Sequence, residues 1–335
     1  MKILVTGGCG FIGSNFIRLM LAKHADWWIV NLDKLTYAGN PANVASVAND
    51  PRYRFVQGDV ADAEVVDDIL SEGGFDAVVN YAAETHVDRS IMDPSAFLKT
   101  AVFGAYVLLE AARKYNIARF IQISTDEVFG AVMEGESGDN APFEPRSPYS
   151  AAKAAADHLV ASYFFTFATP VIITHACNMY GPYHYPEKLF PLFITNLMEG
   201  KTVPVYGDGM QVREWMHIDD HARAIELLLV RGVLGQSYNI GTGERLPNIE
   251  IIKQILALMG KDESSIEYVK DRAGHDRRYA INSDKIRAEL GWAPQITLAQ
   301  GLAATIEWFK THEEWWKPIK SGEYAKYYEE QYTKR

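Results

Sequence analysis

Short apolar runs alternate with longer amphipathic stretches through the first half of the chain. Runs that are apolar along their whole length predict strands buried on both faces, and the stretches between them carry apolar residues at helical spacing. The expected strands are KILVTG (2–7), WWIVNLD (27–33), RFVQGDV (54–60), DAVVNYAA (76–83) and RFIQIS (119–124); the expected helices are SNFIRLMLAKH (14–24), AEVVDDILSEG (63–73), FLKTAVFGAYVLLEAARKY (97–115) and YSAAKAAADHLVASYFF (149–165).

This strand–helix rhythm is typical of βαβ units, so we expect an α/β fold with a Rossmann-type, doubly wound parallel sheet. Residues 1–170 should form a dinucleotide-binding domain, to which later segments return. From residue 171 the pattern loosens into Pro- and Gly-rich loops, NMYGPYHYPEKLFP and VYGDGMQVREW among them. Residues 171–335 are therefore expected to form mainly a smaller lobe that binds the substrate. Residues 313–332 predict a polar, aromatic-rich tail helix without assignable chemistry.

A glycine-rich turn follows the first expected strand. Gly7, Gly10 and Gly13 lie in GGCGFIG, where their backbone can approach a pyrophosphate at the positive end of a helix. Asp33 ends the second strand, and its carboxylate can accept hydrogen bonds from ribose hydroxyls while repelling a 2′-phosphate. The combination predicts NAD rather than NADP. The alternative is a glycine turn in an α/β protein that binds no nucleotide.

Two adjacent acids, Asp126 and Glu127, follow the fifth expected strand in STDEVFG. Downstream, Tyr149 and Lys153 are four residues apart on a predicted helix and so share one face. An ammonium group near a phenol favours the phenolate, which would make Tyr149 a base able to take a hydroxyl proton. The acids alone could equally form a solvated turn or a helix start.

The motifs GGCGFIG, STDEVFG and YSAAK together resemble those of the extended short-chain dehydrogenases/reductases. The acid doublet marks nucleotide-sugar 4,6-dehydratases within that family. Nearly the whole chain is similar to the dTDP-glucose 4,6-dehydratases, through NLDKLTYAGN, AAETHVDRSI, GPYHYPEKL, YGDGMQVREW and AGHDRRYAIN.

The resemblance implies an NAD-dependent lyase that converts dTDP-glucose to dTDP-4-keto-6-deoxyglucose, as a step of deoxysugar biosynthesis. Tyr149 would deprotonate the 4-hydroxyl while hydride passes from C4 to NAD. Glu127 would remove the C5 proton, and Asp126, kept protonated by burial and by its neighbour, would protonate the departing 6-hydroxyl. The hydride then returns to C6. Thr125, which would bind the 4-oxygen or Tyr149, and Lys153 complete the implied catalytic set.

The same resemblance implies the binding residues. For the cofactor these are Gly7, Gly10, Phe11, Ile12, Gly13, Asp33, Lys34, Thr36, Asp59, Val60, Ala82, Ala83, Tyr149 and Lys153. For the nucleotide sugar they are His86, Thr125, Asn178, Lys188, Leu189, Pro204, Tyr206, Arg213, Asn248, Arg272 and His275. No metal site is expected. His86 has an equally open alternative, the stabilisation of a turn.

Four positions depart from what the family resemblance leads us to expect. Ala101 and Met179 stand where asparagine is usual, His175 where arginine is usual, and Phe129 where tyrosine is usual. These departures leave two alternatives open. One is a 4,6-dehydratase or epimerase for another nucleotide sugar, such as a UDP-sugar, and the other is an NAD-binding relative without catalysis.

Composition and charge narrow the kinds of binding partner and the cellular location that we expect. The net charge of −10 and a pI near 5.4 argue against nucleic acid or an anionic membrane as partner. Only two cysteines occur and no signal-like segment is seen, so we expect a cytoplasmic protein. No apolar run is expected to reach the length needed to cross a bilayer. The two long helices over 97–115 and 149–165 carry more apolar surface than one sheet face needs, which predicts a homodimer through a four-helix bundle.

Overall fold

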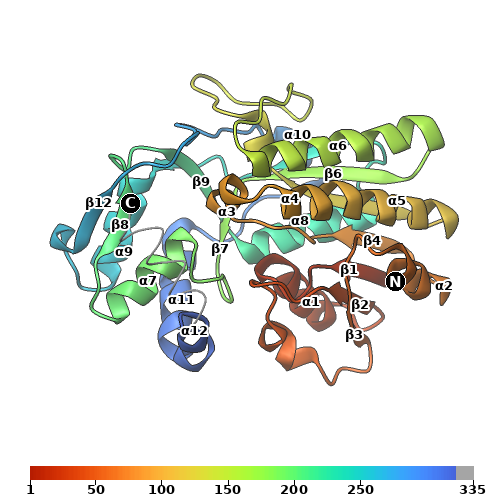
Figure 1. The fold of residues 1–335 in the computed structure, drawn as a ribbon, viewed down its shortest axis with the longest axis horizontal. Helices are drawn as coiled ribbons and strands as arrows, with labels where there is room; N and C mark the ends of the chain where they lie inside the picture. The colour runs from red at the N-terminus through yellow and green to blue at the C-terminus, as the bar shows by residue number, and fades with distance from the viewer. Residues whose placement is uncertain (322–335) are drawn as a thin grey trace.

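The computed structural model describes residues 1–321, and its centre is a parallel sheet of seven strands (Figure 1). The strand order is β10-β6-β5-β4-β1-β2-β3, and every neighbouring pair runs parallel. The direction of winding reverses between β1 and β4, which confirms the doubly wound fold. The strands are β1 (Lys2–Thr6), β2 (Trp28–Asp33), β3 (Tyr53–Gln57), β4 (Ala77–Asn80), β5 (Arg119–Thr125), β6 (Val171–Ala176) and β10 (Ser237–Ile240).

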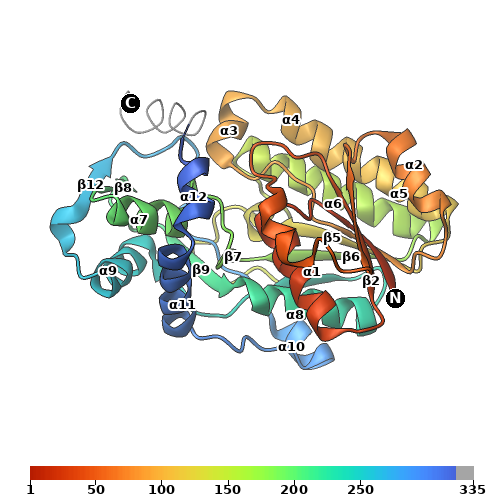
Figure 2. The same ribbon diagram turned by 90° about the horizontal axis from the view of Figure 1, so that it is seen from below.

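Helices cover both faces of this sheet (Figures 1 and 2). One face packs against α1, α8 and α10, and the other against α2, α5 and α6. Because both faces are covered, the inner strands are apolar along their length, as the pattern of the sequence predicts, whereas the edge strand β3 is largely exposed. The helices are α1 (Phe11–Lys23), α2 (Ala63–Ser71), α3 (Val87–Met92), α4 (Ser95–Leu98), α5 (Gly104–Lys114), α6 (Pro148–Phe167), α8 (Ile218–Arg231) and α10 (Asp284–Leu290).

One helical segment corrects an expectation. Helix α4, a π-helical turn at Lys99–Phe103 and α5 form one helix, Ser95–Lys114, that is long and apolar enough to cross a bilayer. The expectation that no segment has this length is therefore wrong. Its inner side, including Leu108 and Leu109, is fully buried against the sheet. Length and composition alone are weak evidence for a membrane span, because a core helix passes the same test.

The second lobe is smaller and lies beyond the carboxyl ends of the strands (Figure 1). It contains two small sheets, β11-β9-β7 and β12-β8, around a separate apolar core. The strands β6 and β10 and the helices α8 and α10 come from after residue 170 and belong to the large sheet and its layers. The lobe comprises β7 (Asn178–Tyr180), α7 (Leu189–Met198), β8 (Val203–Tyr206), β9 (Val212–His217), β11 (Arg245–Pro247), α9 (Asn248–Leu258), β12 (Ile266–Val269), α11 (Leu298–Thr311) and α12 (Glu313–Ile319). The remainder of the predicted tail helix, from residue 322, lies outside the described residues.

Candidate active site

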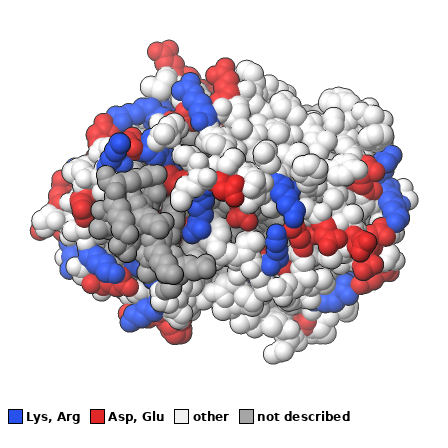
Figure 3. Space-filling model, in the orientation of Figure 1, with Lys and Arg blue, Asp and Glu red and all other residues white. Residues whose placement is uncertain are grey.

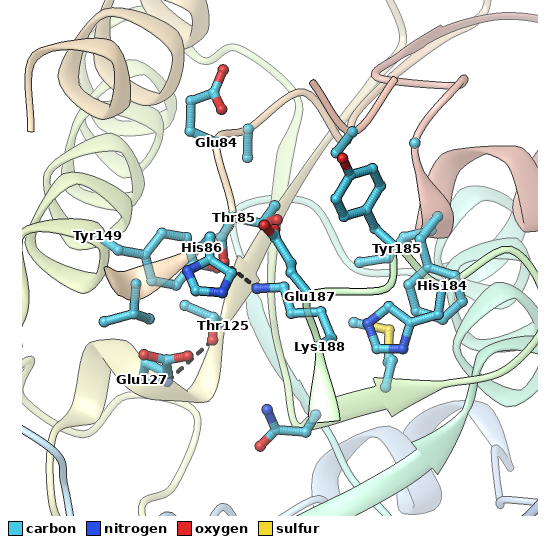
Figure 4. Close-up of a pocket in the computed structure, with 18 of the residues that line it drawn as sticks. Glu84, Thr85, His86, Thr125, Glu127, Tyr149, His184, Tyr185, Glu187 and Lys188 are labelled. Carbon is cyan, nitrogen blue, oxygen red and sulfur yellow. Dashed lines mark hydrogen bonds between the residues drawn. The ribbon is translucent and has the colours of Figure 1, made fainter. Parts of the chain in front are cut away.

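A cavity of about 390 Å³ lies between the two lobes, at the carboxyl ends of the parallel strands (Figure 4). This is where open α/β sheets bind their ligands. Every site residue expected from the sequence lines this one cavity: Gly7, Gly10, Phe11, Ile12, Gly13, Asp33, Lys34, Thr36, Asp59, Val60, Ala82, Ala83, His86, Thr125, Asp126, Glu127, Tyr149, Lys153, Asn178, Lys188, Leu189, Pro204, Tyr206, Arg213, Asn248, Arg272 and His275. The roles assigned to these residues stay predictions.

The glycine turn fits a dinucleotide. Gly7 has φ +66°, and a Cβ on it would lie 2.8 Å from the backbone nitrogen of Ala82. A Cβ on Gly13 would lie 2.5 Å from the Gly7 carbonyl oxygen, and Gly10 is the N-cap of α1. Side chains at Gly7 and Gly13 would therefore push β1, β4 and α1 apart. Without them, the start of α1 presents free backbone N–H groups to the cavity, as a pyrophosphate requires.

Asp33 joins this turn to the ribose side of the cavity. It ends β2, and its two carboxylate oxygens accept hydrogen bonds of 2.8 Å from the backbone N–H groups of Cys9 and Leu35. Burial raises its pKa, while these two hydrogen bonds lower it. Nearby, Asp59 forms an ion pair of 2.9 Å with Lys34. The residues present fit NAD, with Asp33 positioned to face ribose hydroxyls.

The two acids share the cavity wall because the strand ends before them. β5 stops at Thr125, and Asp126–Phe129 form a 3-10 helix that Thr125 caps through its side chain. Strand alternation, which would point neighbours to opposite faces, no longer applies. Figure 4 shows Glu127, Thr125 and Tyr149 together on one side of the cavity. The arrangement explains how adjacent acids can serve one substrate.

Asp126 is held in its neutral form near pH 7. The side chain is 3% exposed, and its Oδ2 has no hydrogen-bond partner among the described residues. Burial, followed by the neighbouring Glu127 carboxylate, raises the pKa of Asp126 to about 8. A neutral carboxylic acid next to a second carboxyl group is the pairing needed for general acid and general base.

Asp126→Asn should stabilise the folded protein increasingly as the pH rises. The pKa of Asp126 is about 8 in the folded chain against an ordinary 3.8, so the folded state binds this proton more tightly than the unfolded chain does. The stability of the parent therefore falls between about pH 4 and pH 8, and the variant lacks this loss. We expect its melting temperature to exceed the parent's by about 2–5 °C at pH 8, with no gap at pH 4.

The measurement is thermal unfolding across this pH range, with Asp68→Asn on the exposed side of α2 as control. The control should follow the parent's pH dependence. If the melting temperatures of Asp126→Asn and the parent differed by the same amount at every pH, Asp126 would be ionised in the folded protein.

Tyr149 and Lys153 lie in the first turns of α6, on its inner face. Ser147 forms a capping box with Ser150, and Pro148 occupies the first helical position, so the helix begins just before Tyr149. The Lys153 Nζ donates a 2.5 Å hydrogen bond to the Ile123 carbonyl. The pair thus stands against the end of β5, next to the two acids.

The expected lowering of the Tyr149 pKa is wrong for the chain taken alone. Burial raises the pKa of Tyr149, and Glu127 raises it further, whereas a hydrogen bond with Thr125 lowers it. Burial also lowers the pKa of Lys153. The helical spacing placed the two residues on one face of α6, but removing both from water shifts the pKa of each in the direction that disfavours its charged form.

Cationic side chains line the other arm of the cavity. The Lys188 Nζ donates a 2.6 Å hydrogen bond to the Thr85 carbonyl (Figure 4), and the Arg213 guanidinium lies 4.1 Å from the Tyr279 ring centroid. Arg272 lies 3.9 Å from Asp88. The Oδ1 atom of Asn178 is buried without a partner in the part of the chain described. Three cationic side chains lining one cavity suit a diphosphate.

The far end of this arm is aromatic and apolar. Tyr206 donates a 3.0 Å hydrogen bond to Asp88, and its ring meets His275 edge-on at 6.0 Å. His275 is paired with Asp271 at 2.6 Å. Leu189, Pro204 and Asn248 also line the cavity. A flat heterocycle such as a nucleobase suits such a wall.

The sequence did not identify the segment His184–Lys188 as a bridge between the lobes. His184 stacks on Phe11 with ring centroids 4.1 Å apart. Glu187 accepts a 2.9 Å hydrogen bond from Tyr37 and pairs with Arg89 at 3.3 Å. The sequence YHYPEK, with its aromatic and charged residues, was a signal that this segment makes specific contacts. The residues that it contacts are far away along the chain, so the sequence did not identify them. Tyr279 and Gln211 also line the cavity and were missed.

The four departures from the family pattern lie in different places. Met179 lines the cavity. Ala101 is buried in the π-helical turn. Phe129, in the 3-10 helix, and His175, on β6, are buried with their rings 4.9 Å apart. Within residues 1–321, no group of three or more His, Cys, Asp and Glu side chains is arranged to hold a metal ion.

Comparison with known proteins places this geometry in context. A family model described as GDP-mannose 4,6 dehydratase matches residues 4–305. A dTDP-glucose 4,6-dehydratase of Streptomyces niveus is 48% identical, over 97% of this chain and 97% of its own. DesIV, the dTDP-glucose 4,6-dehydratase of Streptomyces venezuelae solved with NAD bound, is 49% identical with TM-score 0.93, covering 96% of this chain and all of its own. The enzyme of that name from Bacillus anthracis, in complex with NAD, is 46% identical with TM-score 0.90 and the same coverage.

Proposed function

The chain belongs to the dTDP-glucose 4,6-dehydratase family of the extended short-chain dehydrogenases/reductases, and on this premise we propose that it converts dTDP-glucose to dTDP-4-keto-6-deoxyglucose and water. It is a lyase, and NAD is its cofactor. The observation that carries the proposal is the juxtaposition of a neutral acid, a second carboxyl group and Tyr149 on one wall of the cavity. An epimerase needs no acid pair, so this wall favours dehydration.

Tyr149 takes the proton of the sugar 4-hydroxyl, and the hydroxyl of Thr125 orients the same oxygen. When bound, NAD supplies a nicotinamide ring that accepts a hydride from C4 and later returns one to C6. The ammonium group of Lys153 lies one helical turn from Tyr149 and supports the phenolate. The resulting 4-ketone makes the C5 hydrogen acidic.

Glu127 removes the C5 proton, and Asp126 protonates the 6-hydroxyl so that it leaves as water. Glu127 then returns its proton to C5. At the end of the cycle Tyr149 holds one proton more and Asp126 one fewer than at the start. The Thr125 hydroxyl donates to Asp126 at 3.3 Å and also bonds with Tyr149, so it joins the two groups that must exchange this proton.

The nucleotide and diphosphate occupy the arm of the cavity formed by the second lobe. Lys188, Arg213 and Arg272 neutralise the diphosphate, and Asn178 donates its side-chain amide. Leu189, Pro204, Tyr206, Asn248 and His275 enclose the base and its sugar. His86, at the start of α3, lines the cavity and faces the sugar.

Incubation of the purified protein with dTDP-glucose, and separately with UDP-glucose, tests the function. Mass spectrometry should show loss of one water from dTDP-glucose, at a rate well above that for UDP-glucose. A faster reaction with UDP-glucose would indicate that the substrate is a UDP-sugar rather than a dTDP-sugar. Retention of sugar mass with inversion at C4 would indicate an epimerase, and no reaction with NAD bound would indicate a non-catalytic relative.

A homodimer is part of the proposal, formed through α5 and α6. Figure 3 shows the face over these helices largely free of charged side chains. Phe103 is 62% exposed there, and Leu98 and Tyr106 are about half exposed. Pairing two copies of this face would bury these side chains in a four-helix bundle.

Phe103→Glu should convert the dimer to a monomer, because two carboxylates would have to be buried in a symmetric interface. Light scattering on a size-exclusion column should give twice the chain mass for the parent and the chain mass for the variant. Phe55→Glu, on the opposite edge strand β3, is the matched control and should stay dimeric. A monomeric parent would contradict the proposal.

A cytoplasmic location completes the proposal. Cys9 and Cys177 are both unpaired and buried, which suits a reducing compartment. Fractionation of the source cells, followed by immunodetection, checks this location; recovery with the membrane or secreted fraction would contradict it.

A further inference from the structure

A buried carboxylate that the chemistry above does not use lies directly behind the catalytic groups. Asp157 is on α6, one turn after Lys153, and is 1% exposed. Its Oδ2 accepts a hydrogen bond from the Ser124 hydroxyl at the end of β5 and lies 3.5 Å from the His175 Nε2. Its Oδ1 has no hydrogen-bond partner among residues 1–321. A carboxylate removed from water to this extent needs a compensating charge.

Among the described residues the ion-pair partner of Asp157 is His175, and Lys153 is the cation one helical turn away along α6. Both side chains are buried and are four residues apart on the inner face of the same helix, a spacing at which side chains are neighbours. The Lys153 ammonium meets a carbonyl oxygen, that of Ile123, at 2.5 Å. Burial lowers the pKa of Lys153, and Asp157 is the charge that raises it.

Other titratable groups surround the same position. Tyr149 lies on α6 itself, His175 comes from β6, and Asp126 and Glu127 follow β5. Asp139 interacts with His175 from the far side. The rings of Phe129 and Phe143 meet His175 edge-on at 4.9 and 5.4 Å. Lys153 is the lysine in this set, and adjacent residues at the end of β5 hold it and Asp157: the Ile123 carbonyl accepts from Lys153, and the Ser124 hydroxyl donates to Asp157.

We propose that Asp157 is a positioning residue that keeps Lys153 charged and so sets the pH range over which Tyr149 works as a base. The role rests on the proposed function. Asp157 does not touch the reacting atoms; it acts through Lys153. The negative charge of Asp157 also raises the pKa of Tyr149 directly. Removal of that charge therefore lowers the pKa values of both Lys153 and Tyr149.

Asp157→Asn keeps the size of the side chain and removes its charge. The test is the pH dependence of the oxidation step alone, followed as reduced nicotinamide in a single turnover in the Glu127→Gln background. Loss of the negative charge lowers the pKa of Tyr149 and of Lys153. We therefore expect both limbs of the pH–rate profile, the rise at low pH and the fall at high pH, to move to lower pH by about one unit. Asp157→Glu, which retains the charge, should restore the parent's limbs.

Two further measurements separate this role from a structural one. His175→Arg places a permanent cation beside Asp157 and should move both limbs in the same direction without changing Asp157. Asp220→Asn removes another fully buried carboxylate, one bonded to the backbone of Gln295 and Ile296, and should lower the melting temperature without moving the limbs.

Protein without cofactor supplies a readout independent of turnover. Because the pKa of Lys153 is lower in the folded chain, stability rises with pH above that pKa. In Asp157→Asn and His175→Arg this rise should begin about one pH unit lower. The proposal would be overturned if, in both Asp157→Asn and His175→Arg, neither the pH–rate profile of the oxidation nor the pH dependence of stability shifted. Absence of reduced nicotinamide in the Glu127→Gln protein would instead count against the proposed function, leaving the stability curves to decide the role of Asp157.

Discussion

Glu127→Gln should halt the reaction after the sugar has been oxidised. The amide cannot accept the C5 proton, so loss of water should slow about 10²- to 10⁴-fold. The oxidation uses Tyr149 and Lys153, which the substitution leaves in place. Reduced nicotinamide should therefore accumulate on the protein after dTDP-glucose is added, and its absorbance measured by stopped flow, together with product mass, checks this outcome.

The matched control is Glu134→Gln, which changes an exposed glutamate in the loop after the 3-10 helix. It should dehydrate dTDP-glucose as fast as the parent. A normal rate of water loss in Glu127→Gln would remove this residue from the elimination step. Absence of reduced nicotinamide would place its action earlier, at the oxidation.

Tyr149→Phe should slow the oxidation itself, also by about 10²- to 10⁴-fold. The substitution removes the hydroxyl and keeps the ring, which packs edge-on against Phe97 at 6.2 Å. Neither reduced nicotinamide nor the dehydrated product should form at an appreciable rate. Single-turnover absorbance and mass spectrometry measure both.

The contrast between the two variants is the informative result. Accumulation of reduced nicotinamide in Glu127→Gln but not in Tyr149→Phe would show that oxidation, which needs Tyr149, comes before the elimination of water, which needs Glu127. Tyr268→Phe, on the exposed strand β12, should behave as the parent. Rapid formation of reduced nicotinamide in Tyr149→Phe would show that another group removes the hydroxyl proton.

The fold was predictable because its signals are local. Apolar strands, the glycine turn at Gly7 and the helix carrying Tyr149 and Lys153 each depend on residues close together in the sequence. The acid pair was found in the same way. The spacing also shows which residues share a face, and so which side chains can meet in the site.

Other features depend on contacts that spacing does not encode. The pKa of Tyr149 is governed by burial, which depends on packing from both lobes. Glu187 binds Tyr37, from the loop after β2, and Arg89, from helix α3, and both partners are far away along the chain. A helix over residues 97–115 was predicted, but its membrane-spanning length and apolarity were missed, because its polar positions interrupt the apolar pattern without interrupting the helix. Such features require the folded structure.

The strand order has a consequence for biosynthesis. β10 pairs with β6 but follows it in the chain by some sixty residues, across α7, β8, β9 and α8. While the ribosome is still making those residues, the outer edge of β6 has no neighbour to pair with. A nascent chain in that state presents a strand edge able to pair with another chain. The edge of β6 is therefore covered only after the chain through residue 240 has left the ribosome.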